Sequence, residues 1–225
     1  MSAPESGVLP GAPPGTAPYS ASEIAALRLP DIIAPGLDLL FVGFNPSVIS
    51  AVRGHYYARP GNRFWLLLAL AGLTPRRYAP EEDRTLLDLG IGITDLCPIP
   101  TPGIADVPRA VAEAGRGALT AKVEKFAPRI VSFNGKATYE RFFGRLPAGW
   151  GRQEARIGDA GSLAFVTPSS SGRANGVTPE REAAYLVLGA LVRAGRARGW
   201  ATPGAGILEW PSVVGRQRGV GGVGE

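Results

Sequence analysis

The chain has 225 residues, enough to bury one ample hydrophobic core, and its 45% of hydrophobic and 19% of charged residues are the ordinary balance of a single globular domain. Its single cysteine and single histidine exclude an internal disulfide, a four-cysteine zinc site and a cysteine-ligated iron–sulfur cluster, and they argue against a conventional transition-metal site. The formal net charge is +5 and most cations are arginines, which suits a nucleic-acid partner because guanidinium groups grip phosphate and stack on bases, although a GC-rich coding sequence also enriches arginine.

The two ends of the chain differ in composition from its middle. Residues 1–19 are rich in proline, glycine and alanine and predict a disordered arm, residues 20–202 predict one folded domain, and residues 203–225 predict a loose tail. No apolar run reaches the ~18 residues of a membrane span, and the N-terminus lacks the basic and apolar regions of a signal peptide. We therefore expect a cytoplasmic protein with no contact with a membrane.

Apolar runs, cap residues and glycine or proline stops predict strands that alternate with helices. In chain order they are a helix over 22–29 capped by Ser22, a strand over 37–42, a helix over 63–71 capped by Asn62, a helix over 81–89, a strand over 92–96, a helix over 107–126, a strand over 129–133, a helix over 136–143, a strand over 163–166 and a helix over 179–196. This order predicts an α/β protein with three α/β/α layers and a mostly parallel central sheet.

Polar side chains follow each predicted strand. Asn45 (in GFNPS) comes after the first strand, Asp95 lies near the end of the second, FNGK follows the third, and TPSSSGR at residues 167–173 follows the fourth. Parallel α/β sheets bind ligands at the carboxyl ends of their strands, so we expect these groups to meet at one rim of the sheet.

Each of these signals has a functional and a structural interpretation. Asn45 could hold a water molecule through its carbonyl or merely close a turn, and Asp95 could be a general base, stabilise a cationic sugar, cap a turn or pair with an arginine. The tyrosines at 56–57 could offer a flat face to a base, and His55 could touch a phosphate or sugar, or all three could be packing residues. Residues 167–173 suit phosphate or form a solvated loop.

Several common sites are missing from the sequence. FNGKA fails the phosphate-binding GxxxxGK[ST] pattern, and neither GxGxxG nor GxSxG occurs. We therefore expect no cofactor and no metal.

The motifs in their order carry a family resemblance. GFNPS, GHYYARPGNRFW, GIGITDL, IPTPG, RIVSFNGKATYE and TPSSSGR together resemble the mismatch-specific uracil-DNA and thymine-DNA glycosylase family, over residues 31–185. PGNRFW, GIGIT, FNGK and the PSSS-x-R loop are closest to the thymine-DNA branch. The resemblance implies a metal-free three-layer α/β enzyme that flips a mispaired base out of DNA and hydrolyses its N-glycosidic bond.

The same resemblance implies roles for individual residues. Asn45 matches the asparagine that positions the attacking water, Thr101 a threonine that helps to hold that water, and Tyr57 the aromatic residue that stacks on the flipped base. Backbone N–H groups near Phe44 and around residues 47–50 could stabilise the departing anionic base. The residues that match the DNA-gripping and intercalating loop are Ser169, Ser170, Ser171 and Arg173.

Three positions depart from the family pattern. Ser47 stands where glycine is usual, which could tighten the pocket floor or add a hydroxyl group to the base-binding residues, which also include Ser50. Asp95 replaces an asparagine or lysine, and we hypothesise that it shares catalysis with Asn45 or takes it over. Tyr56 stands where the thymine-DNA branch often has histidine, so activity on thymine is an open question.

The sequence as a whole predicts a monofunctional DNA glycosylase that acts on uracil, best opposite guanine, with thymine or damaged pyrimidines as secondary substrates. None of the residues proposed to form the pocket is a lysine that could form a Schiff base, which argues against strand cleavage. We expect a monomer in the bacterial nucleoid whose partner is double-stranded DNA. The alternatives are a nucleoside N-ribohydrolase and a catalytically weak mismatch- or lesion-binding protein.

Overall fold

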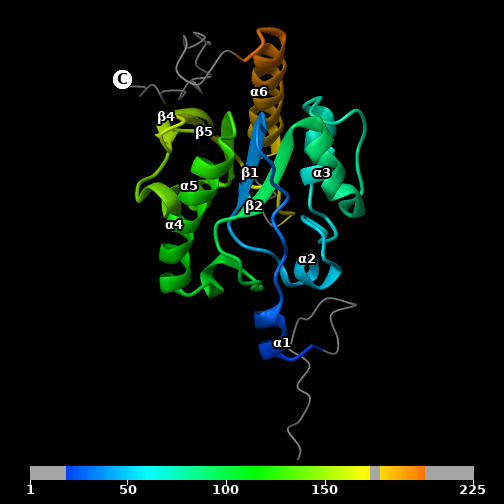
Figure 1. Cartoon of the computed structure of the whole chain (residues 1–225). Helices are drawn as coiled ribbons and strands as arrows, with labels where there is room; N and C mark the ends of the chain where they lie inside the picture. Colours follow the sequence, from blue (N-terminus) through cyan, green and yellow to red (C-terminus); the bar gives the residue numbers. More distant parts are fainter. Residues whose placement is uncertain (1–18, 173–177, 201–225) are drawn as a thin grey trace, which may run out of the picture.

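A five-stranded sheet forms the centre of the protein. The computed structural model describes residues 19–172 and 178–200 (Figure 1). The strand order is β2-β1-β3-β5-β4, and all neighbours are parallel except β4 and β5. The strands are β1 (Leu39–Gly43), β2 (Ile91–Asp95), β3 (Ile130–Asn134), β4 (Gly151–Ile157) and β5 (Ser162–Thr167).

Helices cover both faces of this sheet (Figure 1). Strand β1 is buried on both sides, as expected of a central parallel strand, with Leu39 and Phe41 in one hydrophobic cluster and Leu40 and Val42 in the other. The α-helices are α1 (Ala21–Ala26), α2 (Val48–Arg53), α3 (Phe64–Leu70), α4 (Arg109–Phe126), α5 (Lys136–Phe143) and α6 (Thr178–Ala197), and two 3-10 helices are η1 (Pro80–Leu89) and η2 (Ile104–Asp106).

The predicted three-layer α/β fold with a mostly parallel sheet is confirmed. Most predicted elements agree with the observed ones to within two residues, and the helix over 136–143 agrees at both ends. The first helix differs, because Ser20 rather than Ser22 is its N-cap and it ends at Ala26. The helix over 81–89 is a 3-10 helix.

Three elements were not predicted, and the shortest of them is the 3-10 helix η2. Helix α2 begins directly after the Asn-Pro step, where Ser47 caps it. Strand β4 contains no apolar run: it lies at one edge of the sheet and buries only Gln153 and Ile157, and its other residues are at least partly exposed.

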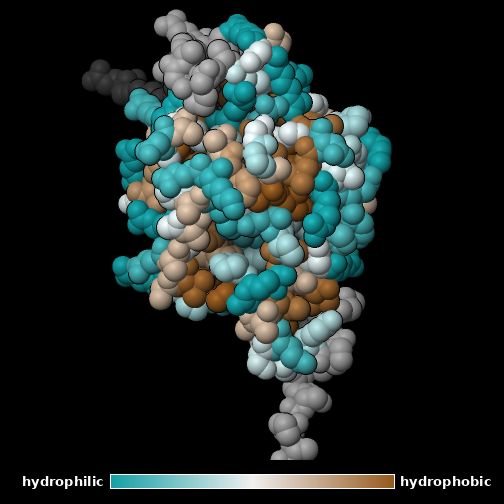
Figure 2. Space-filling view, viewed as in Figure 1, coloured by the Kyte–Doolittle hydropathy of each residue, from teal (hydrophilic) through white to brown (hydrophobic). Residues whose placement is uncertain are grey.

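The surface is mixed in character. Polar residues cover most of the face shown in Figure 2, and apolar groups gather near its centre and its lower part. Among residues 19–172 and 178–200, no helix is long and apolar enough to cross a membrane. The predicted arm and tail lie almost wholly outside the described residues.

Candidate active site

A pocket of about 400 Å³ lies at the carboxyl ends of the parallel strands, a size suited to a small ligand such as one base. These ends point toward α2, at the lower side of the molecule in Figure 1. Arg173 lies outside the described residues, but the pocket lining includes every other residue of the predicted site: Phe44, Asn45, Ser47, Ser50, Tyr57, Asp95, Thr101, Ser169, Ser170 and Ser171.

Strand register brings the chain segments of this pocket together. Gly43, the last residue of β1, pairs with Asp95, the last residue of β2. The chains then continue side by side, because the N–H of Cys97 donates to the carbonyl of Phe44 and Ser47 forms a parallel bridge with Thr101. The segment after β1 is thereby placed against the segment after β2, although about fifty residues separate them in the sequence.

The amide of Asn45 has a fixed orientation. Its Nδ2 donates to Thr101 Oγ1 at 2.8 Å, to the Ile99 carbonyl at 3.1 Å and to the Pro46 carbonyl at 3.2 Å. Thr101 in turn donates its hydroxyl hydrogen to the Gly103 carbonyl at 2.6 Å. Only an N–H group can face two carbonyls, so Nδ2 points into the wall and Oδ1 is the atom left to accept a hydrogen bond from a bound molecule. Thr101 therefore contacts Asn45 directly and orients it.

Asp95 is a carboxyl group in an enclosed position at the pocket wall. Its Oδ2 has no hydrogen-bond partner among the described residues. Burial, and secondarily the negative charge of Asp31, raise the pKa of Asp95 to about 8, while Lys122 partly opposes this shift. At neutral pH the protonated acid is therefore the main form.

Glycine at position 43 makes room for this carboxyl group. A Cβ atom on Gly43 would lie 2.1 Å from Asp95 Oδ1. Any side chain at this end of β1 would therefore displace Asp95.

A polar cluster that the sequence did not reveal is built around Thr94, the neighbour of Asp95 in β2. Lys122 Nζ lies 2.6 Å from Asp31 Oδ2 and donates to Thr94 Oγ1 at 3.0 Å, and Thr94 Oγ1 donates to Asp31 Oδ1 at 2.5 Å. Asp31 and Lys122 are 91 positions apart in the sequence, and no motif joins them. Residues 19–172 and 178–200 contain no group of three or more His, Cys, Asp or Glu that could hold a metal ion.

The two serines of the GFNPS segment and α2 form a small network. Ser47 caps α2 by accepting the backbone N–H of Ser50 at 3.1 Å, and its hydroxyl donates to Ser50 Oγ at 3.0 Å. Ser50 Oγ also accepts the N–H of Ala58 at 3.2 Å. With both acceptor positions occupied, the hydroxyl hydrogen of Ser50 remains free to donate to a ligand. The backbone N–H of Ser50, which we expected to face the base, is used by the cap instead.

Tyr57 has the geometry of a stacking platform. One face of its ring stacks on Phe64 with centroids 3.8 Å apart and planes at 22°, and the ring also lines the pocket. Its hydroxyl accepts a hydrogen bond from Asn134 Nδ2 at 3.3 Å. Burial is the main cause that raises the pKa of Tyr57 well above its usual value, so the phenol stays neutral.

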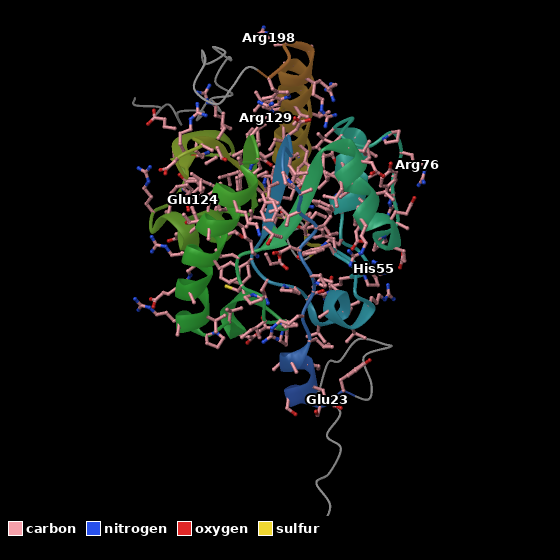
Figure 3. The ribbon with its side chains drawn as sticks, in the orientation of Figure 1. Glu23, His55, Arg76, Glu124, Arg129 and Arg198 are labelled. Carbon is pink, nitrogen blue, oxygen red and sulfur yellow. The ribbon has the colours of Figure 1, made fainter. Side chains whose placement is uncertain are left out.

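Tyr56 and His55, the two residues before Tyr57, have surroundings typical of packing residues. Tyr56 is 3% exposed and belongs to the hydrophobic core, and its N–H donates to Asp83 Oδ2 at 3.0 Å. His55 is not part of the pocket lining; its Nδ1 lies 3.4 Å from the same carboxylate oxygen. Figure 3 shows His55 in the segment that joins α2 and α3. The packing interpretation therefore fits His55 better than contact with a sugar or phosphate.

The TPSSSG loop contains one buried and two partly exposed serines. Ser170 is 0% exposed, its N–H and Oγ bond to Asn134, and its carbonyl accepts the N–H of Arg63 at 2.9 Å. This leaves no surface of Ser170 for a phosphate, contrary to our expectation. Ser169 and Ser171 are partly exposed and line the pocket, so these two serines are the ones that a ligand could reach.

Comparison with known proteins gives one family. Residues 30–187, more than half of the chain, match the Uracil DNA glycosylase superfamily. Among solved structures, the chain is similar to the solution NMR structure of a provisionally assigned uracil DNA glycosylase from Methanosarcina acetivorans, with 20% sequence identity and a TM-score of 0.46 over 74% of this chain and 98% of the other.

Proposed function

The chain belongs to the uracil DNA glycosylase superfamily, and we propose that it is a monofunctional glycosylase that flips uracil out of a duplex and hydrolyses its N-glycosidic bond, with uracil opposite guanine as its preferred substrate. The observation that carries the proposal is the fixed amide of Asn45, whose Oδ1 is available in a base-sized pocket that also contains Asp95 and the ring of Tyr57. Thymine and damaged pyrimidines would be secondary substrates.

Asn45 suits the positioning of a water molecule. A neutral amide cannot remove a proton, but its Oδ1 can accept a hydrogen bond from water and direct the water oxygen at the sugar carbon. That is sufficient when the glycosidic bond lengthens first and the sugar gains oxocarbenium character, because such a cation accepts water without a strong nucleophile.

The departing base carries negative charge and needs hydrogen-bond donors. The hydroxyl hydrogen of Ser50 is available, since both lone-pair positions of its oxygen are already occupied. The hydroxyl of Tyr57 lies in the plane of a ring that would stack on the base, so Ser50 is the donor that we assign to a carbonyl oxygen of uracil.

Asp95 is proposed as a general base for the water that Asn45 positions. With a pKa of about 8, the ionised form is the minor one at neutral pH, so the rate should rise about tenfold per pH unit from pH 6 and level off near pH 8. Single-turnover rates of the wild type and of Asp95→Asn across this range test the role. If Asp95→Asn keeps the full rate at every pH, Asp95 is not catalytic.

The first experiment uses a short duplex with one uracil opposite guanine and the matching single strand. Each is incubated with purified protein in EDTA, treated with hot alkali and separated on a gel. Alkali-dependent cleavage at the uracil is the expected result, with the duplex cut faster than the single strand. Cleavage without alkali would contradict the monofunctional mechanism.

A gel shift of the same duplex and an assay on free deoxyuridine separate the alternative functions. An intact strand with a retained shift of the duplex would indicate a lesion-binding protein. Hydrolysis of free deoxyuridine at a rate similar to that on the duplex would indicate a nucleoside hydrolase.

A further inference from the structure

We propose that Asn134 is a positioning residue that holds the stacking ring of Tyr57 and the TPSSSG loop in register with each other across the pocket. The inference rests on the proposed glycosylase function and deepens it. Asn134 belongs to the FNGK segment of the sequence, to which no role was assigned.

The backbone places Asn134 between two walls of the pocket. It is the last residue of β3 and pairs with Thr167, the last residue of β5, just before the loop. Gly135 follows with a φ of +108°, a conformation that favours glycine, and its N–H donates to the Thr167 carbonyl at 2.8 Å. The chain of β3 thus turns away sharply, and the side chain of Asn134 lines the pocket.

Both ends of the Asn134 amide bond to these walls. On the loop side, Oδ1 accepts the N–H of Ser170 at 2.9 Å and Nδ2 donates to Ser170 Oγ at 3.0 Å. On the ring side, Nδ2 donates to the Tyr57 hydroxyl at 3.3 Å. Because only the carbonyl oxygen can accept the N–H of Ser170, the amide cannot be reversed, and the same geometry fixes the bond to Tyr57.

The backbone of Tyr57 provides an independent observation. Its φ is +53°, in the left-handed region, which is strained for a residue with a side chain. Stacking on Phe64 and the bond from Asn134 offset this strain. Strain of this kind at a pocket wall indicates that the position of the ring matters for function.

The loop is also held tightly on its other side. The carbonyl of Ser170 accepts the N–H of Arg63, and a Cβ atom on Gly172 would lie 2.7 Å from the Gly61 carbonyl oxygen. The loop therefore has little freedom to shift independently of the segment that carries Tyr57. Asn134 bridges the two, so its loss should affect stacking on the base through Tyr57 and contact with DNA through the loop.

The test is a pair of double-mutant cycles on the full chain. Asn134→Leu removes all three hydrogen bonds at similar side-chain volume. Tyr57→Phe keeps the ring and removes the hydroxyl group that accepts from Asn134, and Ser170→Ala removes the hydroxyl group on the loop. Single-turnover excision from the uracil–guanine duplex gives a rate, and binding of the same duplex carrying a non-hydrolysable uracil nucleotide gives Kd. We expect Asn134→Leu to slow excision about 30-fold and to raise Kd about 5-fold.

The cycles should show which partner carries each effect. Adding Asn134→Leu to Tyr57→Phe should slow excision by much less than 30-fold, and adding it to Ser170→Ala should raise Kd by less than 5-fold. Additive effects in both cycles, or an Asn134→Leu variant with unchanged rate and Kd, would overturn the inference.

Controls separate this proposal from the function on which it rests. Ser132→Ala changes a fully buried serine on the same strand whose hydroxyl has no partner among the described residues, and it should alter neither quantity. If Asn134→Leu does not fold, Asn134→Ser, which is too short to reach either partner, replaces it. A wild type without excision would refute the proposed function, whereas an active wild type with a fully active Asn134→Leu would refute only this inference.

Discussion

Asn45 shows how neighbouring residues decide which atom of a side chain can act. An amide side chain can in principle turn either its oxygen or its nitrogen toward a pocket. Here Nδ2 of Asn45 is held by the carbonyls of Pro46 and Ile99 and by Thr101, whose own hydroxyl hydrogen bonds to the Gly103 carbonyl. Asn-Pro can be read from the sequence, but two of these three acceptors, Ile99 and Thr101, come from a segment more than fifty residues away. The residue could be predicted from its motif, but its orientation could not.

Removal of the Asn45 amide should slow excision severely. We expect Asn45→Ala to slow single-turnover excision by on the order of 10³-fold, because Asn45 Oδ1 is the group proposed to direct the water at the sugar carbon. Thr101→Val should cost about tenfold, since Asn45 keeps its bonds to the Pro46 and Ile99 carbonyls. Thermal unfolding of each variant shows whether the fold survives. Equal losses for the two variants would mean that Thr101 acts directly rather than through Asn45.

Asp95 should make the protein less stable as pH rises. Its pKa is raised from an ordinary carboxyl value near 4 to about 8, so between these pH values the folded state holds a proton that the unfolded state has released. The free energy of unfolding must therefore fall as pH rises through this window. We expect Asp95→Asn to be more stable than wild type at pH 7 by on the order of 1–3 kcal/mol.

Urea unfolding at pH 4 and at pH 8 measures this effect. The stability difference between Asp95→Asn and wild type should be near zero at the lower pH and largest at the higher. A difference that does not depend on pH would show that Asp95 is already ionised in the folded protein.

At the scale of elements, the ends of β1 and β2 depend on each other. The pairing of Gly43 with Asp95 leaves no room for a Cβ atom. Gly43→Ala should therefore lower stability by about 1–3 kcal/mol and slow excision at least tenfold. Gly117→Ala is the matched control, because Gly117 lies in α4 with open space around it, and this change should raise stability by about 0.5–1 kcal/mol. Urea unfolding measures the stability of both variants, and single-turnover assays measure their excision rates. A Gly43→Ala variant with wild-type stability and rate would contradict the close packing of Gly43 against Asp95.

Elements with strong apolar runs could be predicted from the sequence, and those without them could not. The four predicted strands are buried, whereas β4 alternates between buried and exposed positions and lacks such a run. Helix α2 is short and follows a proline that reads as part of a loop. The prediction that Asn62 caps the next helix was wrong, because α3 begins one residue later than expected and Arg63 is its N-cap, although Asn62 does accept the N–H of Phe64 at 3.0 Å.

At the scale of the whole molecule, the positive charge should govern contact with DNA. A net charge of +5 and cations that are mostly arginine should make duplex binding depend strongly on counterion release. We expect the affinity for a uracil–guanine duplex to fall at least tenfold between 50 and 200 mM salt, at roughly the same rate for a matched duplex. Fluorescence anisotropy at several salt concentrations measures this, and an affinity independent of salt would argue against phosphate contacts.

The site as a whole could be predicted only in part. The carboxyl ends of parallel strands had to meet at one edge, so the convergence of Asn45, Asp95 and the TPSSSG loop followed from the order of the elements. The cluster of Lys122, Asp31 and Thr94 beside Asp95 depends on how α4 packs, and the role of Ser170 depends on which side of the loop is buried. Neither of these features is a property of local sequence.

Strand β4 has a consequence for how copies of the protein meet. An outermost strand is a template on which a second chain can add a strand of its own, the first step toward aggregation. Along β4 the exposed positions carry Arg152, Glu154 and Arg156, so a strand added there would have to crowd these charges out of water. The lack of an apolar run, which prevented the prediction of β4, thus also protects this edge of the sheet. It favours separate molecules at the high local concentrations that a repair enzyme would reach along DNA.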